Sequence, residues 1–404
     1  MTSPEREIVL GDFSAVQLRR PVRQEHLLSY LAWLMATARC AANAVSSAED
    51  AAGILAELQE KVRLYGVSPA YIARRQFNAF PDNERALGVQ GQSPQLPEGF
   101  EDILAQPAGP LLDRRMRQVE ELGLRVFRRW YEDEQQRPPN DLIHVTCSGY
   151  VSPSPAQRLV SEKHWPTAVT HSYHMGCYGA FPAIRTAVGL LASPVLSGPE
   201  PKTRVDIIHT EYLSAHVAPL HDGPGNIIDM TLFGDGFIGY SAYPEDAFRA
   251  AGRGAPGLGV LAHHERLIPD SLDEMTWKLG PHQFDMYLSK NVPLSIRDSA
   301  KEFVASLCAR AGIEFERAKG QMLFAIHPGG PKILDHTRDV LGISEEQVAH
   351  SRRVFHELGN MSSATVPHVL MDMLADSAVS AGRLILSMGF GPGLTATGFL
   401  FRKI

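Results

Sequence analysis

The first third of the chain carries the spacing of amphipathic helices. Hydrophobic residues recur every three or four positions, with polar residues between them, over 26–42, 51–65 and 111–135. A short alternating run over 8–16 predicts a strand ahead of them. The stretch 78–107 is rich in Pro, Gly, Gln and Asn and lacks such a period, so we predict a long surface loop there.

From residue 140 onward, apolar runs typical of buried strands alternate with helical spacing. The runs that predict strands are 142–147, 168–175 and 204–211. Residues 179–192 are rich in Ala, Val and Leu and predict a helix. Pro182 is tolerated in the first turn of a helix but not in its interior, so this helix should begin near 179–181. Alternating strands and helices predict an α/β fold.

The alternation starts again after Gly236. The segments that predict strands are 237–243, 257–265, 320–327, 383–389 and 395–402. The segments with helical spacing are 295–311, 331–341, 346–358 and 366–381. We therefore predict two similar α/β halves, residues 1–236 and residues 237–404, as a duplicated unit would give.

The composition is that of an ordinary soluble globular protein. The 404 residues are 44% hydrophobic and 21% charged, and the net charge of −6 argues against a nucleic-acid surface as the main function. We find no run of eighteen apolar residues and no basic leader followed by an apolar stretch, so we expect neither a membrane span nor a secretory signal. The four cysteines lie far apart, which favours reduced thiols and a cytoplasmic location.

Cys177 falls at the turn between the predicted strand 168–175 and the helix that follows it. A thiol at this position feels the positive end of the helix dipole and free backbone N–H groups. Both favour the thiolate, which is the nucleophilic form of cysteine. The alternative is a small buried core residue, which is the usual place of a lone cysteine.

Two further segments set a polar residue among glycines where a predicted strand ends or a helix begins. His327 opens His-Pro-Gly-Gly-Pro331, and Asn360 lies in Gly359-Asn-Met-Ser-Ser363. An imidazole assists thiolate formation, and the N–H donors of His and Asn hold an oxyanion or enolate. Taken singly, His327 also fits a hydrogen-bonded loop histidine, and Asn360 also fits a helix N-cap.

Taken with their flanks, these segments resemble the type III polyketide synthases, the chalcone and stilbene synthase family of the thiolase-like superfamily. The matching strings stand in the family's order and cover roughly residues 140–404. They are Gly176-Cys177, Leu232-Phe-Gly-Asp-Gly236, His327-Pro-Gly-Gly-Pro-Lys-Ile-Leu-Asp335, Gly359-Asn-Met-Ser-Ser363 and Gly389-Phe-Gly-Pro-Gly-Leu394. The His327-Pro-Gly-Gly-Pro331 and Gly359-Asn-Met-Ser-Ser363 strings separate this family from the initiating ketoacyl-ACP synthases and the HMG-CoA synthases, which share its fold.

The resemblance implies a homodimeric condensing enzyme with the five-layered αβαβα thiolase-like fold. In this fold Cys177 would lie at the start of one of the two central helices. Cys177 would take an acyl group from a thioester. A malonyl thioester would lose CO₂, and His327 and Asn360 would hold the resulting enolate while its carbon attacks the acyl group. The implied substrates are acyl-CoA and malonyl-CoA, and the implied products are pyrones, resorcinols or short polyketides. No cofactor is implied.

The resemblance also assigns residues around the acyl chain. Phe233 matches an aromatic gate beside the cysteine, although an aromatic before a Gly-Asp-Gly turn also fits a core residue. The second gate position falls near Met286, two residues from Phe284. The other positions that match the lining of the acyl cavity are Cys147, Glu211, Leu213, His216 and Ser362. His216 replaces a smaller residue and should reshape the cavity.

One departure from the family concerns the coenzyme A phosphates. The family binds them through a basic cluster on a helix, and the corresponding region keeps Lys61 but has Leu64 and Val67 or Ser68 where further basic residues are expected. Arg63, Arg74 and Arg75 lie close by in the sequence. Either nearby arginines substitute, or the acyl group arrives on an acyl carrier protein.

His171 and His174 precede Cys177 at a spacing that suggests zinc. On a strand, however, these two positions point to opposite faces, so we predict no metal site.

Three alternatives to a full polyketide synthase follow from the same residues. One is a synthase of the same fold limited to a single condensation on carrier-bound substrates. Another is a non-catalytic partner subunit, which the presence of Cys177, His327 and Asn360 argues against. The last is a Cys-His-Asn hydrolase, which would need a water-accessible cleft and no malonyl substrate.

Overall fold

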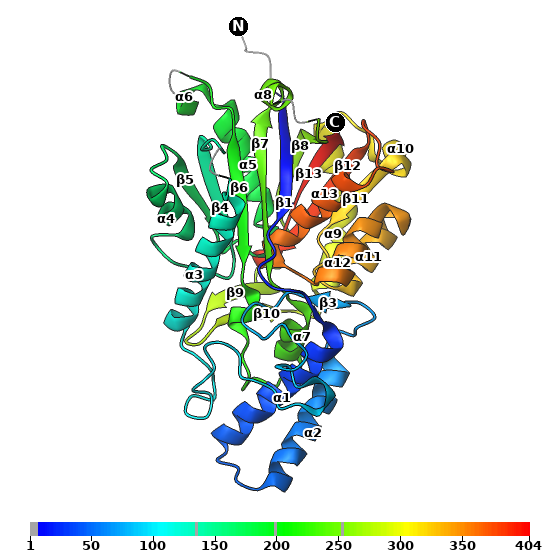
Figure 1. Cartoon of the computed structure of the whole chain (residues 1–404). Coiled ribbons are helices and arrows are strands. Elements are labelled where there is room, and N and C mark those ends of the chain that lie inside the picture. Colours follow the sequence, from blue (N-terminus) through cyan, green and yellow to red (C-terminus); the bar gives the residue numbers. More distant parts are fainter. Residues whose placement is uncertain (1–6, 134–135, 198–199, 252–253) are drawn as a thin grey trace.

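The computed structural model describes residues 7–133, 136–197, 200–251 and 254–404. Within them, nine strands form one mixed sheet in the order β11-β12-β13-β8-β1-β7-β6-β4-β5 (Figure 1). One group comprises β1 (Ile8–Ala15), β7 (Gly236–Pro244), β6 (Val205–Glu211), β4 (Asp141–Thr146) and β5 (Ala168–Tyr173). The other comprises β8 (Leu258–Leu267), β13 (Thr395–Lys403), β12 (Leu384–Gly391) and β11 (Met322–Ile326). The pairs β4–β5, β4–β6 and β11–β12 are parallel.

The two groups of strands are joined only by a short pairing of β1 with β8, at Val9 with Gly259 and Leu10 with Leu258. Helices α5 (Ala180–Ala192) and α13 (Thr365–Ala375) pack in one hydrophobic core with side chains of both groups. The core of α3 (Leu112–Trp130) includes β4 and β6 residues, and that of α9 (Val292–Arg310) includes β11 and β12 residues. The layers are therefore helix, sheet, helix, sheet, helix, as the resemblance implied.

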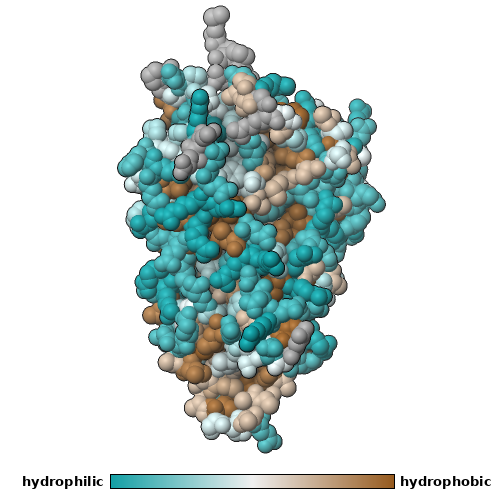
Figure 2. Space-filling view, in the orientation of Figure 1, coloured by the Kyte–Doolittle hydropathy of each residue, from teal (hydrophilic) through white to brown (hydrophobic). Residues whose placement is uncertain are grey.

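Helices α1 (Gln24–Ala42) and α2 (Ala48–Tyr65) form a hairpin at the end of the molecule away from both termini (Figure 1). They contact α7 (Pro224–Leu232), which leads into the glycine turn before β7. The face in Figure 2 is largely hydrophilic, with hydrophobic residues gathered at this lower end. The helical hairpin and α7 share one hydrophobic core with α3 and with residues of β4 and β6.

The remaining elements are short. The strands are β2 (Val22–Arg23), β3 (Arg74–Arg75), β9 (Met275–Leu279) and β10 (Phe284–Leu288). The helices are α4 (Pro155–Glu162), α6 (Pro194–Ser197), α8 (Glu245–Ala250), α10 (Phe315–Ala318), α11 (Pro331–Leu341) and α12 (Ala349–Leu358). No helix in the described residues is both long and apolar enough to cross a bilayer.

Most predicted elements are present, and two helices end earlier than their hydrophobic period. The helix predicted over 111–135 corresponds to α3, which ends at Trp130. The last two positions of that prediction, 134–135, lie outside the described residues. Residues 1–6, where no leader was expected, also lie outside them. The prediction over 366–381 becomes α13, which ends at Ala375. There the Asp376 side chain accepts from the Ala378 N–H at 2.8 Å, and such an Asx turn competes with helix continuation.

The sequence predicted neither α4 nor the β9–β10 hairpin. Strand β7 follows the predicted boundary at residue 236 but pairs with β1 and β6 of the first group. The division of the chain into domains stays a prediction.

Candidate active site

The Cys177 turn joins β5 to α5, as the sequence predicted. Cys177 lies in the 3-10 turn Gly176–Tyr178, and α5 begins at Ala180. Gly176 has a φ of +72°, and a Cβ atom there would overlap Cδ of Pro392. Glycine tolerates the positive φ and has no Cβ atom to clash. The turn can therefore pack directly against the loop after β12, which holds the thiol in place.

Asn360 is held beside this thiol by its backbone and by its own side-chain oxygen. Phe233 and Asn360 form an isolated parallel bridge, next to which the Gly234 N–H donates to the Asn360 carbonyl at 2.9 Å. The Asn360 Oδ1 accepts from the Ser362 N–H at 2.8 Å. Because the oxygen is engaged there, the NH₂ end is left to hydrogen-bond the Cys177 sulfur.

His327 follows β11, and its N–H donates to the Met388 carbonyl of β12 at 2.7 Å. Strand β12 in turn ends against the Cys177 turn, where a Cβ atom on Gly391 would overlap the Tyr178 ring. His327 is only 2% exposed, and neither ring nitrogen has a hydrogen-bond partner within the described part of the chain. Burying an unpaired imidazole costs free energy, which points to a ligand as its partner.

The thiol and the imidazole are both neutral in the resting protein. Burial raises the pKa of the Cys177 thiol to about 12; hydrogen bonds from Ser362 and Asn360 oppose this, and the Glu211 carboxylate adds to it. Burial lowers the pKa of His327 to about 3. The sequence had favoured a thiolate at the helix N-terminus, and the shift is opposite in direction because desolvation outweighs the dipole here.

A direct consequence concerns alkylation of Cys177. Since its pKa lies far above neutrality, the thiolate fraction should rise about tenfold per pH unit. We expect the rate of iodoacetamide labelling, followed at Cys177 by peptide mass mapping, to rise without a plateau between about pH 7 and about pH 9. A short unstructured peptide with one cysteine serves as the control, because its rate begins to level off above an ordinary thiol pKa of about 8.5. A Cys177 rate already flat near neutral pH would show a resting thiolate–imidazolium pair instead.

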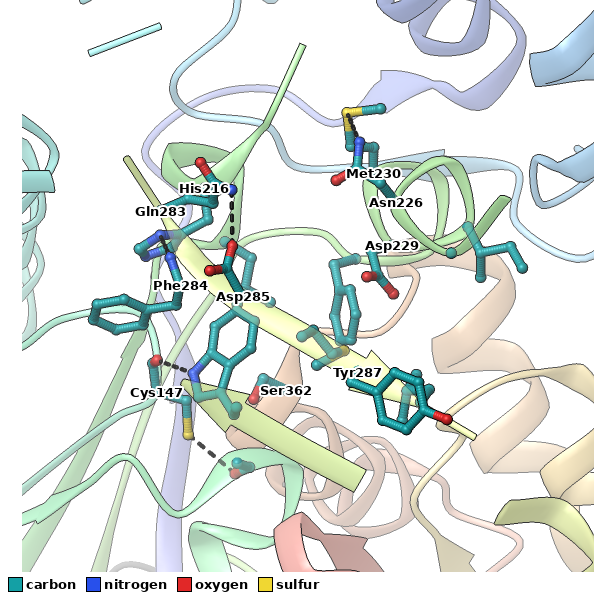
Figure 3. Close-up of a pocket in the computed structure, with 18 of the residues that line it drawn as sticks. Cys147, His216, Asn226, Asp229, Met230, Gln283, Phe284, Asp285, Tyr287 and Ser362 are labelled. Carbon is teal, nitrogen blue, oxygen red and sulfur yellow. Dashed lines mark hydrogen bonds between the residues drawn. The ribbon is translucent and has the colours of Figure 1, made fainter. Parts of the chain in front are cut away.

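A cavity of about 550 Å³ opens onto the Cys177 turn (Figure 3). Its exposed rim residues are His221, Gly225, Ile228, Asp285, Tyr287 and Leu288. The predicted substrate-binding residues that it brings together with Cys177 are Phe233, Cys147, Leu213, His216, Met286 and Ser362. Cavities of this size suit small-molecule ligands.

Glu211 does not line this cavity but lies fully buried behind Cys147. Its carboxylate accepts from the Cys147 N–H at 3.0 Å and from the Ser148 Oγ–H at 3.2 Å, and Ser363 Oγ–H donates to it as well. Burial raises the pKa of Glu211, against these hydrogen bonds. The Cys147 Sγ–H donates to the Gly176 carbonyl at 3.0 Å, so this second thiol is tied to the backbone of the Cys177 turn.

His216 lines the cavity but is not positioned to act as a general base. Its Nε2–H donates to the Ser148 carbonyl at 2.7 Å, and its Nδ1 accepts from the Phe284 N–H at 3.2 Å. Burial lowers the pKa of His216 to about 3. Both ring nitrogens are engaged, so the imidazole is held as one neutral tautomer. Its ring stacks on Phe284 with centroids 4.5 Å apart.

The sequence missed the hairpin that closes one side of the cavity. Trp277 on β9 donates from its indole N–H to the Cys147 carbonyl at 2.8 Å, and Phe284 on β10 is 2% exposed. The signal was present, because 275–279 alternates between apolar and polar residues and Gly280 follows it. Two five-residue strands are too short for that signal to stand out.

The predicted coenzyme A residues do not reach the cavity. Lys61 pairs with Glu57 at 2.9 Å and with Asp222 at 2.5 Å, and Arg39 contacts both carboxylates as well. Arg63 is exposed and pairs with Glu60 at 2.6 Å. Exposed pairs of this kind contribute little stability and exchange readily.

His171 and His174 point to different partners, namely the Ser154 hydroxyl and the Trp277 carbonyl. No group of three or more His, Cys, Asp or Glu side chains suited to a metal ion occurs in the part of the chain described.

Comparisons with known proteins agree with this arrangement. Residues 260–404 match the family described as "Chalcone and stilbene synthases, C-terminal domain". "Type III polyketide synthase 21" from Oryza sativa subsp. japonica is 30% identical over 311 residues, which cover 73% of this chain and 75% of the relative. "1,3,6,8-tetrahydroxynaphthalene synthase" from Streptomyces coelicolor is 28% identical over 257 residues. The match spans only 64% of that relative's length.

The fold is likewise that of solved members of the family. The structure of PKS-I from the brown alga Ectocarpus siliculosus covers 100% of this chain and is itself covered completely, with a TM-score of 0.77 at 22% sequence identity. The five-layered thiolase-like fold expected from the sequence is thereby confirmed. By its sequence matches and its fold, the chain belongs to the type III polyketide synthases, the family of the chalcone and stilbene synthases.

Proposed function

We propose that this protein is a polyketide-forming acyltransferase. It condenses an acyl thioester starter with malonyl thioester units and releases a pyrone, a resorcinol or a short polyketide. The observation that carries the proposal is the neutral thiol of Cys177 in the lining of a cavity of about 550 Å³, hydrogen-bonded by the Asn360 amide. The unpartnered, buried imidazole of His327 lies at the same end of the sheet.

The chemistry begins at the thiol. His327, neutral at physiological pH, accepts the Cys177 proton as the sulfur attacks the starter carbonyl, and the carrier thiol leaves. The product is an acyl group on Cys177. Most of the cavity floor is buried, which keeps water from hydrolysing this intermediate.

The extension step needs donors rather than a base. When the malonyl thioester loses CO₂, the electron pair of the broken C–C bond becomes an enolate, with negative charge on the thioester oxygen. The Asn360 NH₂ and a His327 N–H supply hydrogen bonds to that oxygen. The enolate carbon then forms a bond to the acyl carbon, and the C–S bond to Cys177 breaks.

The oligomeric state, the absence of a cofactor and the form in which substrates arrive are proposed from the resemblance to the family. We propose a homodimer, as the resemblance implies, with no resident cofactor, in which coenzyme A thioesters or acyl carrier protein thioesters deliver the substrates. The described structure holds four unpaired cysteines, which supports a reducing compartment such as the cytoplasm.

The test of function is an incubation with acyl-CoA starters of several lengths and carbon-labelled malonyl-CoA. We expect labelled CO₂ and products longer than the starter by two-carbon units, read by mass spectrometry. The same reaction with carrier-protein thioesters decides which donor is used. Absence of CO₂ and of extended products with both donors would refute the proposal, and hydrolysis of the starter without malonyl dependence would indicate a hydrolase.

A further inference from the structure

The carboxyl of Asp229 lines the cavity and has no hydrogen-bond or ion-pair partner in the described part of the chain. Asp229 lies on α7, and Figure 3 shows its carboxylate beside the cavity, across from the β10 residue Tyr287. Among the described residues its side chain makes no hydrogen bond and no ion pair. Asp229 is half-buried, and withdrawing a carboxyl from water without giving it a partner costs free energy. Because this unpaired carboxyl lies in a cavity wall, a hydrogen-bond donor on a bound ligand is the partner we expect for it.

Three polar side chains in the same lining are already engaged. The Asp285 carboxylate accepts from the Gln283 Nε2–H at 2.9 Å, and the Asn226 amide donates to the Ala218 carbonyl at 3.1 Å. Both nitrogens of His216 are occupied. The described lining contains no Lys or Arg. Asp229 therefore presents an acceptor to which no described residue donates a hydrogen bond.

Its place along α7 puts this acceptor on the substrate's path. The Phe233 N–H donates to the Asp229 carbonyl, so the two residues are one helical turn apart, about 6 Å along the axis. Phe233 bridges to Asn360, while Gly225 and Ile228, nearer the start of α7, are exposed at the cavity rim. A thioester that reaches Cys177 from this rim passes Asp229.

Burial raises the pKa of Asp229 to about 7. The carboxyl is therefore shared between its acid and carboxylate forms near neutral pH. An oxygen accepts a hydrogen bond in either form.

We propose that Asp229 is a substrate-recognition residue, whose carboxyl accepts a hydrogen bond from an O–H or N–H donor of the thioester in the cavity. This inference rests on the proposed function, which supplies the thioester. Two sources carry such a donor: a hydroxyl on the acyl chain, and an amide N–H on the pantetheine arm. In both cases Asp229 selects among thioesters before any carbon–carbon bond forms.

The experiment measures loading of Cys177 and contains no malonyl thioester. One arm compares octanoyl-CoA with hydroxyoctanoyl-CoAs that carry the hydroxyl at successive carbons. The other arm compares the N-acetylcysteamine thioester of octanoate, which has an amide N–H, with its pentyl thioester, which has none. Acyl-enzyme is followed by intact-protein mass spectrometry, and binding by protection of Cys177 from iodoacetamide.

In the wild-type protein, at least one donor-bearing thioester should load about tenfold faster than its donor-free match, the effect of one hydrogen bond in a cavity. Asp229→Leu should erase this preference, and Asp229→Asn, which keeps an acceptor oxygen, should retain most of it. Asp285→Leu removes a second carboxyl of the cavity lining, one that already accepts a hydrogen bond from Gln283, and should change the preference by less than about twofold. The arm that shows the preference identifies the donor.

The proposal is overturned by a wild-type protein without preference in either arm, or by a preference that survives in Asp229→Leu. It is also overturned if Asp285→Leu erases the preference equally, since cavity charge would then explain the effect. A protein that loads or is protected selectively but never extends the chain would defeat the proposed function and leave this inference standing. A protein that neither loads nor is protected refutes both.

Discussion

The Cys177→Ala protein should form no acyl-enzyme when it is mixed with an acyl thioester. Its extended products should fall by a factor on the order of 10,000 or more, because the covalent intermediate has lost its only attachment atom. Intact-protein mass spectrometry detects the acyl adduct, and peptide mapping locates it. The substitution removes one sulfur atom from a half-buried turn, so the melting temperature should stay close to that of the wild-type protein.

The chain provides a matched control in its second cavity thiol. Cys147 also lines the cavity, but its Sγ–H donates to the Gly176 carbonyl. Burial, with the Glu211 and Cys177 charges next, raises the pKa of Cys147 well above its ordinary value. The Cys147→Ala protein should therefore still gain the mass of the acyl group, and peptide mapping should locate that group on Cys177. An adduct that persists in Cys177→Ala and disappears in Cys147→Ala would reverse the assignment.

Local pattern was enough to place the nucleophile and much of its scaffold. Pro182 restricted the start of the helix after Cys177, and α5 begins at Ala180. The prediction for residues 331–341 coincides with α11, whose Pro331 and Gly342 mark its two ends. These features depend on residues within a few positions of one another, which is why sequence carries them.

Features set by distant contacts were not visible in this way. Lys61 stays a predicted phosphate partner, but no local pattern indicated that Asp222, 161 residues away, accepts from its ammonium. The ionisation of Cys177 depends on burial by elements from both halves of the chain, so neighbours in sequence gave the wrong direction. His216 was expected to reshape the cavity, but its role depends on Phe284, 68 residues away.

Asp229 shows a third kind of limit. In the sequence it is one polar residue in a helix, four positions before Phe233. Only the fold shows that this side of α7 borders the cavity and that no donor faces the carboxyl there. The absence of a partner is a property of the whole surrounding surface, so no local pattern encodes it.

The second large effect should separate loading from decarboxylation. Asn360→Asp keeps the shape of the side chain and an oxygen to accept from Ser362 N–H, but it replaces the NH₂ donor with a second carboxylate oxygen. His327→Ala removes the imidazole altogether. Each change should lower CO₂ release from labelled malonyl-CoA by about 100- to 1,000-fold, the usual loss for one oxyanion donor.

Loading should fall less than decarboxylation in the Asn360 variant, because forming the acyl-enzyme depends mainly on the thiol and on the proton acceptor His327. His327→Gln gives the matched control for the imidazole: its amide N–H is a donor but not a base at neutral pH. This variant should recover decarboxylation relative to His327→Ala while loading stays slow. Equal losses of loading and CO₂ release in Asn360→Asp and in both His327 variants would mean that the two residues do not hold the enolate. They would then act on the thiol alone, and the donor for the developing negative charge would have to be sought among the residues that line the cavity.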